Sequence, residues 1–179
     1  MYTLNTIIKN RKSQGRSTFV AFVDMEKAFD RIDRALLFHK LLTLGIGGKI
    51  FNCIKNMYDS CEAIISLNNY STPTFPTNNG IKQGDSLSPT LFGLFINDIV
   101  SVIKESASGT RIEDTYIHCL LYADDIALIA ESEEDLQRML DAVYRWCMKW
   151  RMRENPSLGK THVIHFRPPH SPRTKFKFK

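Results

Sequence analysis

Three aspartates stand at positions where a carboxylate is costly unless a cation neutralises it. Asp124 and Asp125 are adjacent, between two apolar stretches, in the tetrapeptide Tyr122-Ala-Asp-Asp125. Asp24 ends another apolar stretch, Thr18-Phe-Val-Ala-Phe-Val23. Like charges at short range repel, and burial between strands removes their water. Because hard cations such as Mg²⁺ take oxygen ligands, the pattern predicts a divalent-cation site made by Asp24, Asp124 and Asp125.

Such a site has a specific chemistry. Three carboxylates can hold two cations roughly 4 Å apart, which stabilises the attacking and the leaving oxygen of an in-line phosphoryl displacement. Each feature also has a plainer explanation, since an Asp-Asp turn can be solvated and Asp24 can cap a helix. The two features together favour the cation site.

The elements that must position the aspartates follow from the apolar pattern. Residues 18–23 predict a strand buried on both faces, and residues 115–122 and 126–130 predict two apolar strands joined at Ala123-Asp124-Asp125. Paired in one sheet, these strands would bring Asp24 to the Asp-Asp turn. The absence of glycine from that turn is unusual for a tight hairpin.

Helix caps, breakers and apolar spacing give the remaining elements. We expect an α+β fold in which an antiparallel-rich sheet is covered by helices on one face. The predicted elements are a helix from Asp33 to Gly45, a helix through residues 50–58, a hairpin of residues 61–67 and 70–76, a long buried helix from Ser88-Pro89 through Ile103, a helix capped by Ser132 and Asp135, and a short strand at residues 163–166.

Charge is unevenly distributed along the chain. The net charge is +5, yet residues 1–150 hold 16 Lys or Arg against 18 Asp or Glu, whereas residues 151–179 hold 8 against 1. Lys9, Arg11, Lys12 and Arg16 add a second basic end. Basic ends beside a slightly acidic middle suit a metal site bordered by surfaces for a phosphate backbone, and solvated tails explain the charges equally well.

Composition excludes several classes of protein. No apolar run is long enough to span a bilayer, so we expect a soluble intracellular protein with no membrane partner, in either nucleus or cytoplasm. The four cysteines are far apart and form no CxxC pair, which argues against a zinc cluster or a disulfide framework and predicts buried thiols.

Three motifs carry a family resemblance. Phe22-Val-Asp-Met-Glu-Lys-Ala-Phe-Asp30 resembles the first palm motif of reverse transcriptases of LINE-type, non-LTR retrotransposons. Gly80-Ile-Lys-Gln-Gly-Asp-Ser-Leu-Ser-Pro89 is similar to the second motif, and Tyr122-Ala-Asp-Asp125 to the third. Group II intron enzymes are similar but match less well around Asp24–Asp30. The likeness covers about residues 4–178 and predicts a polymerase palm.

The resemblance implies roles for individual residues. Asp24, Asp124 and Asp125 would ligate two Mg²⁺ ions, with Mn²⁺ as an alternative, and carry catalysis. Phe29 matches the aromatic gate against the sugar 2′-hydroxyl, although a core phenylalanine is the other interpretation. The residues implied at the nucleotide are Met25, Glu26, Phe29, Gln83 and Gly84, with Lys82 as a further phosphate contact.

The C-terminal region matches the family less closely. The family pattern has a lysine three residues after an asparagine, whereas Asn155 and Lys160 are five apart, as if Leu158-Gly159 were inserted. Lys160 is therefore a candidate for the acid that protonates pyrophosphate, at a spacing that departs from the family pattern. We expect residues 1–166 to form the palm, and residues 167–179 to be a basic tail or a truncated primer-grip strand.

The resemblance implies an RNA-directed DNA polymerase core, with an RNA template, a DNA primer and deoxynucleoside triphosphates as partners. We expect incomplete fingers, no thumb and a fragment of a retrotransposon polyprotein, whose missing segments belong to the full-length protein. We expect such a fragment to bind Mg²⁺ weakly and to polymerise poorly or not at all, because positioning supplies much of the catalysis. One alternative is an inactive RNA-binding or protein-interaction remnant. Another is a two-metal nuclease, against which Phe29 and the Gln83-Gly84 loop argue.

Overall fold

The computed structural model describes residues 2–155, 160–169 and 171–178. It divides into two compact units. The sheet unit comprises Met1–Glu26 and Asn97–Lys179, and the helical unit comprises Lys27–Ile96. The helical unit is thus inserted between the two chain segments that build the sheet unit.

A four-stranded antiparallel sheet forms the centre of the sheet unit, with the strand order β10–β1–β9–β8. Its four strands were all predicted, and the bounds of β1 are those expected from the sequence. The strands are β1 (Thr18–Val23), β8 (Cys119–Tyr122), β9 (Asp125–Ala130) and β10 (His162–Phe166). The α+β class with an antiparallel sheet is therefore confirmed.

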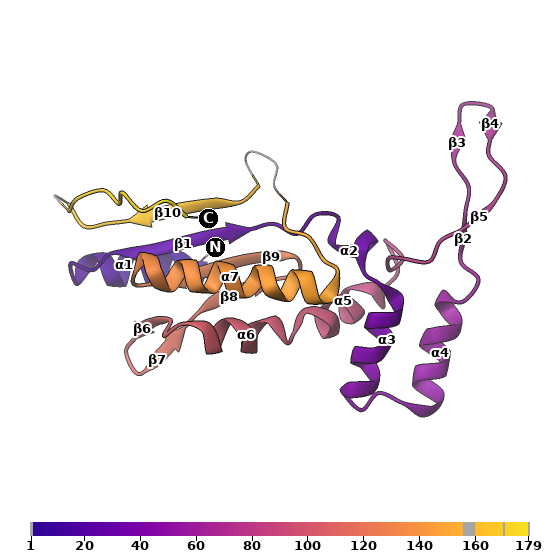
Figure 1. Ribbon diagram of the computed structural model, residues 1–179, viewed down its shortest axis with the longest axis horizontal. Helices are drawn as coiled ribbons and strands as arrows, with labels where there is room; N and C mark the ends of the chain where they lie inside the picture. Colours follow the sequence, from indigo (N-terminus) through magenta and orange to yellow (C-terminus); the bar gives the residue numbers. More distant parts are fainter. Residues whose placement is uncertain (1, 156–159, 170, 179) are drawn as a thin grey trace. The chain divides into compact units, whose positions relative to one another are not determined.

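Helix α7 (Glu133–Trp150) packs against β1 and β9 (Figure 1). As predicted, the Ser132 hydroxyl accepts a hydrogen bond from the Asp135 backbone N–H, and the carboxylate of Asp135 accepts one from that hydroxyl. The apolar residues of α7 recur with the helical period, so they form one buried stripe. Its fully buried members include Leu136, Met139, Val143, Trp146 and Cys147.

Two elements of the sheet unit were not predicted. Helix α1 (Tyr2–Ser13) packs Leu4 and Ile7 on Val20 and Ile129 of the sheet. Successive side chains in a strand point to opposite faces. Val20 therefore shares a face with Phe22, which also packs there. The second element is β6 (Thr110–Ile112), which forms a hairpin with β7 (Thr115–Ile117); the single strand predicted over residues 115–122 is in fact two strands, β7 and β8.

Arg11 corrects part of the charge analysis. Its side chain is 2% exposed, and it donates to Thr18 Oγ1, to the Ser17 carbonyl oxygen and to Glu131 Oε1. The Arg11–Glu131 ion pair has an N–O distance of 2.7 Å. Arg11 therefore ties α1 to the sheet and is not part of a basic surface, whereas Lys9, Lys12 and Arg16 are exposed.

The long apolar helix expected from Ser88 through Ile103 is two helices, α5 (Ser88–Ile96) and α6 (Ile99–Ser106). The break falls at Asn97-Asp98, residue types whose side chains compete with helical hydrogen bonds. Asp98 Oδ1 accepts a hydrogen bond of 2.8 Å from Trp146 Nε1. The prediction of burial holds, because the apolar residues of both helices, such as Phe95 and Ile103, are buried.

The helical unit contains the remaining predicted elements. The Asp33 carboxylate caps α3 (Arg34–Thr43) by accepting from the Ala35 and Leu36 amides. After the short α2 (Ala28–Arg31) and α3 come α4 (Gly48–Tyr58), β2 (Glu62–Ala63), β3 (Ser66–Leu67), β4 (Tyr70–Ser71) and β5 (Phe75–Pro76), where β2 pairs with β5 and β3 with β4. The hairpin is thus confirmed.

Three smaller expectations also have outcomes. All four cysteines are free, but only Cys147 is buried and Cys53 is exposed, so the buried-thiol prediction holds for one residue. None of the described helices is long and apolar enough to cross a membrane. Residues 171–178 form no strand, although Thr174 hydrogen-bonds to Glu133 and the rings of Phe176 and Phe178 lie 4.9 Å apart.

Candidate functional site

Asp24 and Asp125 lie at neighbouring positions in the sheet. In the β1–β9 pair, Val23 is opposite Ile126. Asp24 follows the last residue of β1 and Asp125 begins β9, so the two aspartates stand next to the last residue pair of the two strands. Both carboxylates belong to the face that carries Phe22 and Ala127, because side chains alternate along a strand.

A cavity of about 390 Å³ opens on this face. Asp24, Asp125, Tyr122 and Lys160 contribute its polar lining. Leu4, Phe22, Leu120 and Ala127 are among its apolar lining residues. The structure therefore brings Lys160 to the same cavity as two of the three aspartates. The inserted pair Leu158-Gly159 lies outside the described residues.

Asp124 occupies the turn of the β8–β9 hairpin. Tyr122 pairs with Asp125, so Ala123 and Asp124 form a two-residue loop. Ala123 supplies the positive φ of 51° that a turn with this twist requires, without a glycine. Asp124 is half-buried and Asp125 is exposed. The sequence argument assumed that both carboxylates lose their water, and the exposure of Asp125 corrects it.

The donors at this edge of the sheet are the carboxylates of Asp24, Asp124 and Asp125. Carboxylate oxygen is the ligand type that Mg²⁺ prefers, so the donors suit a hard cation. Among the described residues, no three His, Cys, Asp or Glu side chains converge closely enough to form a metal-binding group. Asp24 and Asp125 fit as ligands by position, and Asp124 lies in the turn between β8 and β9 without lining the cavity.

Asp24 is bonded to the segment that follows α7. Asn155 Nδ2 donates to Asp24 Oδ2 at 2.8 Å, and the Asn155 backbone N–H donates to the Asp24 carbonyl oxygen at 2.8 Å. The Glu26 backbone N–H donates to the Arg153 carbonyl oxygen at 2.9 Å. These bonds form a short antiparallel ladder across Met25 and Glu154. The contact of Asn155 with Asp24 was not foreseen, although Asn155 belongs to a recognised motif.

Met25 and Glu26 occupy different environments. Met25 is 2% exposed, and its Sδ lies 3.8 Å from Cys147 Sγ. Burial, together with the charge of Glu154, raises the pKa of the Cys147 thiol to about 12, so this cysteine remains protonated at neutral pH. Burial also raises the pKa of Glu154. The Glu26 amide is already engaged with Arg153.

In the helical unit, the first and second motifs are joined by hydrogen bonds. The Ile81 backbone N–H donates to the Phe29 carbonyl oxygen at 2.9 Å, and the Gly80 N–H donates to the Ile32 carbonyl oxygen at 2.8 Å. Gln83 Nε2 donates to Asp30 Oδ1 at 2.8 Å. The loop that carries Gln83 and Gly84 is therefore fixed beside the segment that carries Phe29.

Phe29 is half-buried and stacks on Phe92 of α5, with ring centroids 4.8 Å apart and an angle of 16° between the rings. This is the packing that the core interpretation of Phe29 predicts. A half-buried ring can pack on a helix and still present an edge to a ligand, so the gate role stays a prediction. Gly84 has φ +82°, and no atom lies within 4 Å of the position that a Cβ would take, which allows close approach of a ligand.

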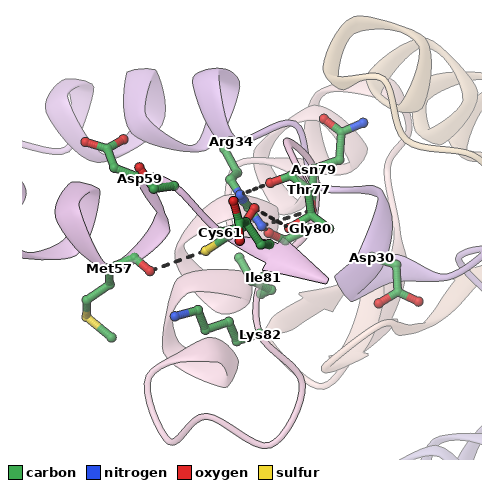
Figure 2. A pocket seen from close by; sticks show the side chains of 12 residues that line it. Asp30, Arg34, Met57, Asp59, Cys61, Thr77, Asn79, Gly80, Ile81 and Lys82 are labelled. Carbon is green, nitrogen blue, oxygen red and sulfur yellow. Dashed lines mark hydrogen bonds between the residues drawn. The ribbon is translucent and has the colours of Figure 1, made fainter. Parts of the chain in front are cut away.

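Arg34 lines a cavity of about 480 Å³ in the helical unit and hydrogen-bonds to other residues that line it (Figure 2). Its guanidinium donates to the carbonyl oxygens of Thr77, Asn79 and Gly80 at 2.5, 3.2 and 2.8 Å. Lys82 also lines this cavity, and its Nζ lies 5.8 Å from the ring centroid of Tyr58. Sequence reasoning missed Arg34, although a cation at a helix N-terminus opposes the helix dipole and could have drawn notice.

The predicted site residues therefore form two groups. Asp24, Met25, Glu26, Asp124, Asp125 and Lys160 belong to the sheet unit, and Phe29, Lys82, Gln83 and Gly84 belong to the helical unit. The expectation that Gln83 faces the same cleft as Asp124 stays a prediction.

Comparison with solved structures identifies the fold. Apo telomerase from Candida tropicalis, truncated from its C-terminal domain, is similar with a TM-score of 0.69 and 17% sequence identity, over 99% of this chain and 36% of that one. A telomerase from the same organism, in complex with a fragment of telomeric RNA, gives a TM-score of 0.65 at 15% identity, over 98% and 30% of the two chains. The fold of this chain is therefore similar to that of about one third of each telomerase chain.

Comparison of sequences identifies the family. The family model for reverse transcriptase (RNA-dependent DNA polymerase) matches residues 2–178. This chain belongs to the reverse transcriptase family. The polyprotein of retrotransposable element R2DM from Drosophila melanogaster is 28% identical, over 77% of this chain and 13% of its own length. An uncharacterized protein of transposon TX1 from Xenopus laevis is 27% identical, over 94% and 14%. The chain thus spans about one seventh of these relatives.

Proposed function

We propose that this chain is the palm core of an RNA-directed DNA polymerase from a non-LTR retrotransposon, which adds deoxynucleotides to a primer 3′-hydroxyl. One observation carries the proposal. Asp24 follows the last residue of β1, Asp125 begins the neighbouring strand β9, and both line one cavity. The match to the reverse transcriptase family supports polymerisation as the reaction in which Asp24 and Asp125 take part.

In this proposal, Asp24, Asp124 and Asp125 hold two Mg²⁺ ions, or Mn²⁺ in their place. The cations supply charge neutralisation for the phosphates and align the reacting oxygens. Lys160 is available at the same cavity as a proton donor.

The helical unit contributes the nucleotide contacts. Gln83, oriented by Asp30, hydrogen-bonds the incoming nucleotide, and Gly84 allows its close approach. The edge of Phe29 opposes a 2′-hydroxyl, and Lys82 contacts a phosphate. In the sheet unit, the backbone at Met25 and Glu26 lies near the triphosphate. The RNA template and DNA primer are held in part by exposed basic residues of the C-terminal segment: Arg151, Arg153, Arg173, Lys175 and Lys177.

A second candidate function is an inactive RNA-binding remnant. It is favoured by the absence of a ready three-ligand metal group among the described residues. The two functions differ in their need for Asp124. The polymerase uses it as a metal ligand, whereas RNA binding through basic side chains does not need it.

Primer extension on an RNA template, with Mg²⁺ and all four deoxynucleotides, tests the proposal. We expect slow but measurable extension by this chain and a loss of at least about a hundredfold in Asp124→Asn, because charge stabilisation contributes at least that much. Asp114→Asn is the matched control, since Asp114 is an exposed aspartate between the two strands of the β6–β7 hairpin. Extension that survives Asp124→Asn contradicts the proposal, and RNA binding without any extension supports the remnant.

A further inference from the structure

We propose that Asn155 is a positioning residue for Asp24, holding its carboxylate in the orientation in which it binds a divalent cation. The inference rests on the proposed function and deepens it, because it adds to the three aspartates a residue that does not itself touch the cation. Its basis is the pair of 2.8 Å hydrogen bonds that joins Asn155 to Asp24.

The two bonds leave Asp24 little freedom. The backbone bond fixes the position of Asn155 relative to the carbonyl group of Asp24, and the side-chain bond then fixes the carboxylate about its own rotatable bonds. Both residues are half-buried, so water competes less for the bond than it does at a fully exposed pair. The ladder through Met25–Glu154 and Glu26–Arg153 keeps the two segments in register.

The chemistry of the bond favours cation binding. A neutral amide donates to the carboxylate without bringing a positive charge that would repel a cation, as Lys or Arg would. A carboxylate has about four acceptor sites, so one amide bond leaves capacity for a metal ion. Hydrogen bonds from outer residues to metal ligands orient them, and their removal typically lowers metal affinity by about 10–100-fold.

Asn155 also connects the site to α7. The backbone N–H of Met152 bonds to the Cys147 carbonyl oxygen at the end of α7, and three residues later Asn155 reaches Asp24. The buried Met152 and Trp150 anchor this connection. The orientation of Asp24 is therefore set by the packed end of a helix as well as by its own strand.

Direct binding of Mn²⁺ to the 179-residue protein tests the inference, with free Mn²⁺ counted by electron paramagnetic resonance. We expect Asn155→Ala and Asn155→Leu to raise the Kd for Mn²⁺ by about tenfold. Asn155→Leu keeps the branched shape of the side chain and Asn155→Ala shortens it, so one variant remains informative if the other does not fold by circular dichroism. Gln137→Ala is the matched control, because Gln137 Nε2 donates to Asp141 Oδ1, also at 2.8 Å, on the exposed face of α7.

The outcomes separate this inference from the proposed function. Loss of binding in Asp24→Asn, weakened binding in both Asn155 variants and unchanged binding in Gln137→Ala support the positioning role. Loss in Asp24→Asn with wild-type affinity in a folded Asn155 variant overturns the role and leaves the metal site intact. Wild-type affinity in Asp24→Asn overturns the metal site itself, and the role of Asn155 with it.

Extension at increasing Mg²⁺ gives a second readout. A positioning role predicts that the Asn155 variants need about tenfold more Mg²⁺ for half-maximal extension and recover most of the wild-type rate at saturation. A residue that only stabilises the fold lowers the rate at every Mg²⁺ concentration. A rate that stays low at saturating Mg²⁺ in a folded variant therefore counts against the inference.

Discussion

The two groups of predicted site residues are held by different kinds of interaction. In the sheet unit, Asp24 and Asp125 take their positions from the register of β1 and β9, which is fixed by backbone bonds and by the burial of apolar side chains. In the helical unit, Gln83 and Gly84 lie on a loop held by the Arg34 side chain and by bonds from Gly80 and Ile81. In the sheet unit, substitution of a site residue should therefore change activity with little change in the free energy of unfolding. In the helical unit, a substitution that loosens the loop should change both.

Arg34→Ala should show the largest effect. It removes the hydrogen bonds that a charged donor makes to four carbonyl oxygens, those of Tyr58, Thr77, Asn79 and Gly80. We expect a loss of about 4 kcal/mol in the free energy of unfolding, measured by urea denaturation. Arg138→Ala is the control, since Arg138 forms an exposed ion pair with Asp135, and it should cost under about 1 kcal/mol. Equal effects in the two variants would remove the contrast between the units.

Gly80→Ala should have an intermediate effect. Gly80 has φ +82°, and a Cβ there would lie 2.9 Å from the Asp30 carbonyl oxygen, which belongs to backbone that cannot easily move. We expect a loss of about 3 kcal/mol, of which the left-handed conformation alone accounts for about 1 kcal/mol.

Gly84→Ala isolates the contribution of conformation, because Gly84 has the same φ of +82° and no atom within 4 Å of the position that a Cβ would take. It should cost only about 1 kcal/mol by thermal or urea unfolding. A Gly80→Ala variant as stable as Gly84→Ala would show that the loop can move away from Asp30.

The smallest effect concerns the pH dependence of the sheet unit. His165 stacks on Phe19 with ring centroids 4.1 Å apart, and burial lowers its pKa below 6.5, against an opposing effect of Glu133 and with a smaller contribution from Arg167. A depressed histidine pKa means that the unfolded chain binds the proton more readily. Stability should therefore be fully present above about pH 6.5 and fall as the pH drops below it.

His165→Phe should reduce this fall in the thermal midpoint between about pH 7.5 and pH 5. It should not abolish it, because burial and Lys104 also lower the pKa of His118. The control is His162→Phe, since His162 is an exposed histidine on the same strand. Parallel pH profiles for wild type and His165→Phe would contradict the assignment.

The strands of the sheet, and the aspartates beside them, could be predicted from sequence because these strands are continuous apolar runs. Thr18–Val23 has no polar residue beyond its first, so its burial and the position of Asp24 at its end follow directly. A tight turn was also predicted, because only Ala123-Asp124-Asp125 separate the two apolar stretches; in the structure Asp125 is paired and the loop is Ala123-Asp124.

The contacts of Arg34 and Asn155 could not be predicted in the same way. Each depends on a side chain that meets backbone or a carboxylate far away in the sequence, and no local pattern encodes such a meeting. The break between α5 and α6 was missed because apolar residues continue on both sides of Asn97-Asp98. Helix α1 was missed because its apolar residues are few and spread among polar ones.

The insertion of one unit within the other has a consequence for synthesis on the ribosome. Strand β1 pairs with β9 and β10, each more than a hundred residues later in the chain. At about 5–20 residues per second, β1 therefore waits on the order of 5–20 seconds before its first partner strand emerges. The inserted unit is continuous and can fold during that interval, whereas β1, apolar on both faces, is exposed to aggregation or chaperone binding until β9 arrives.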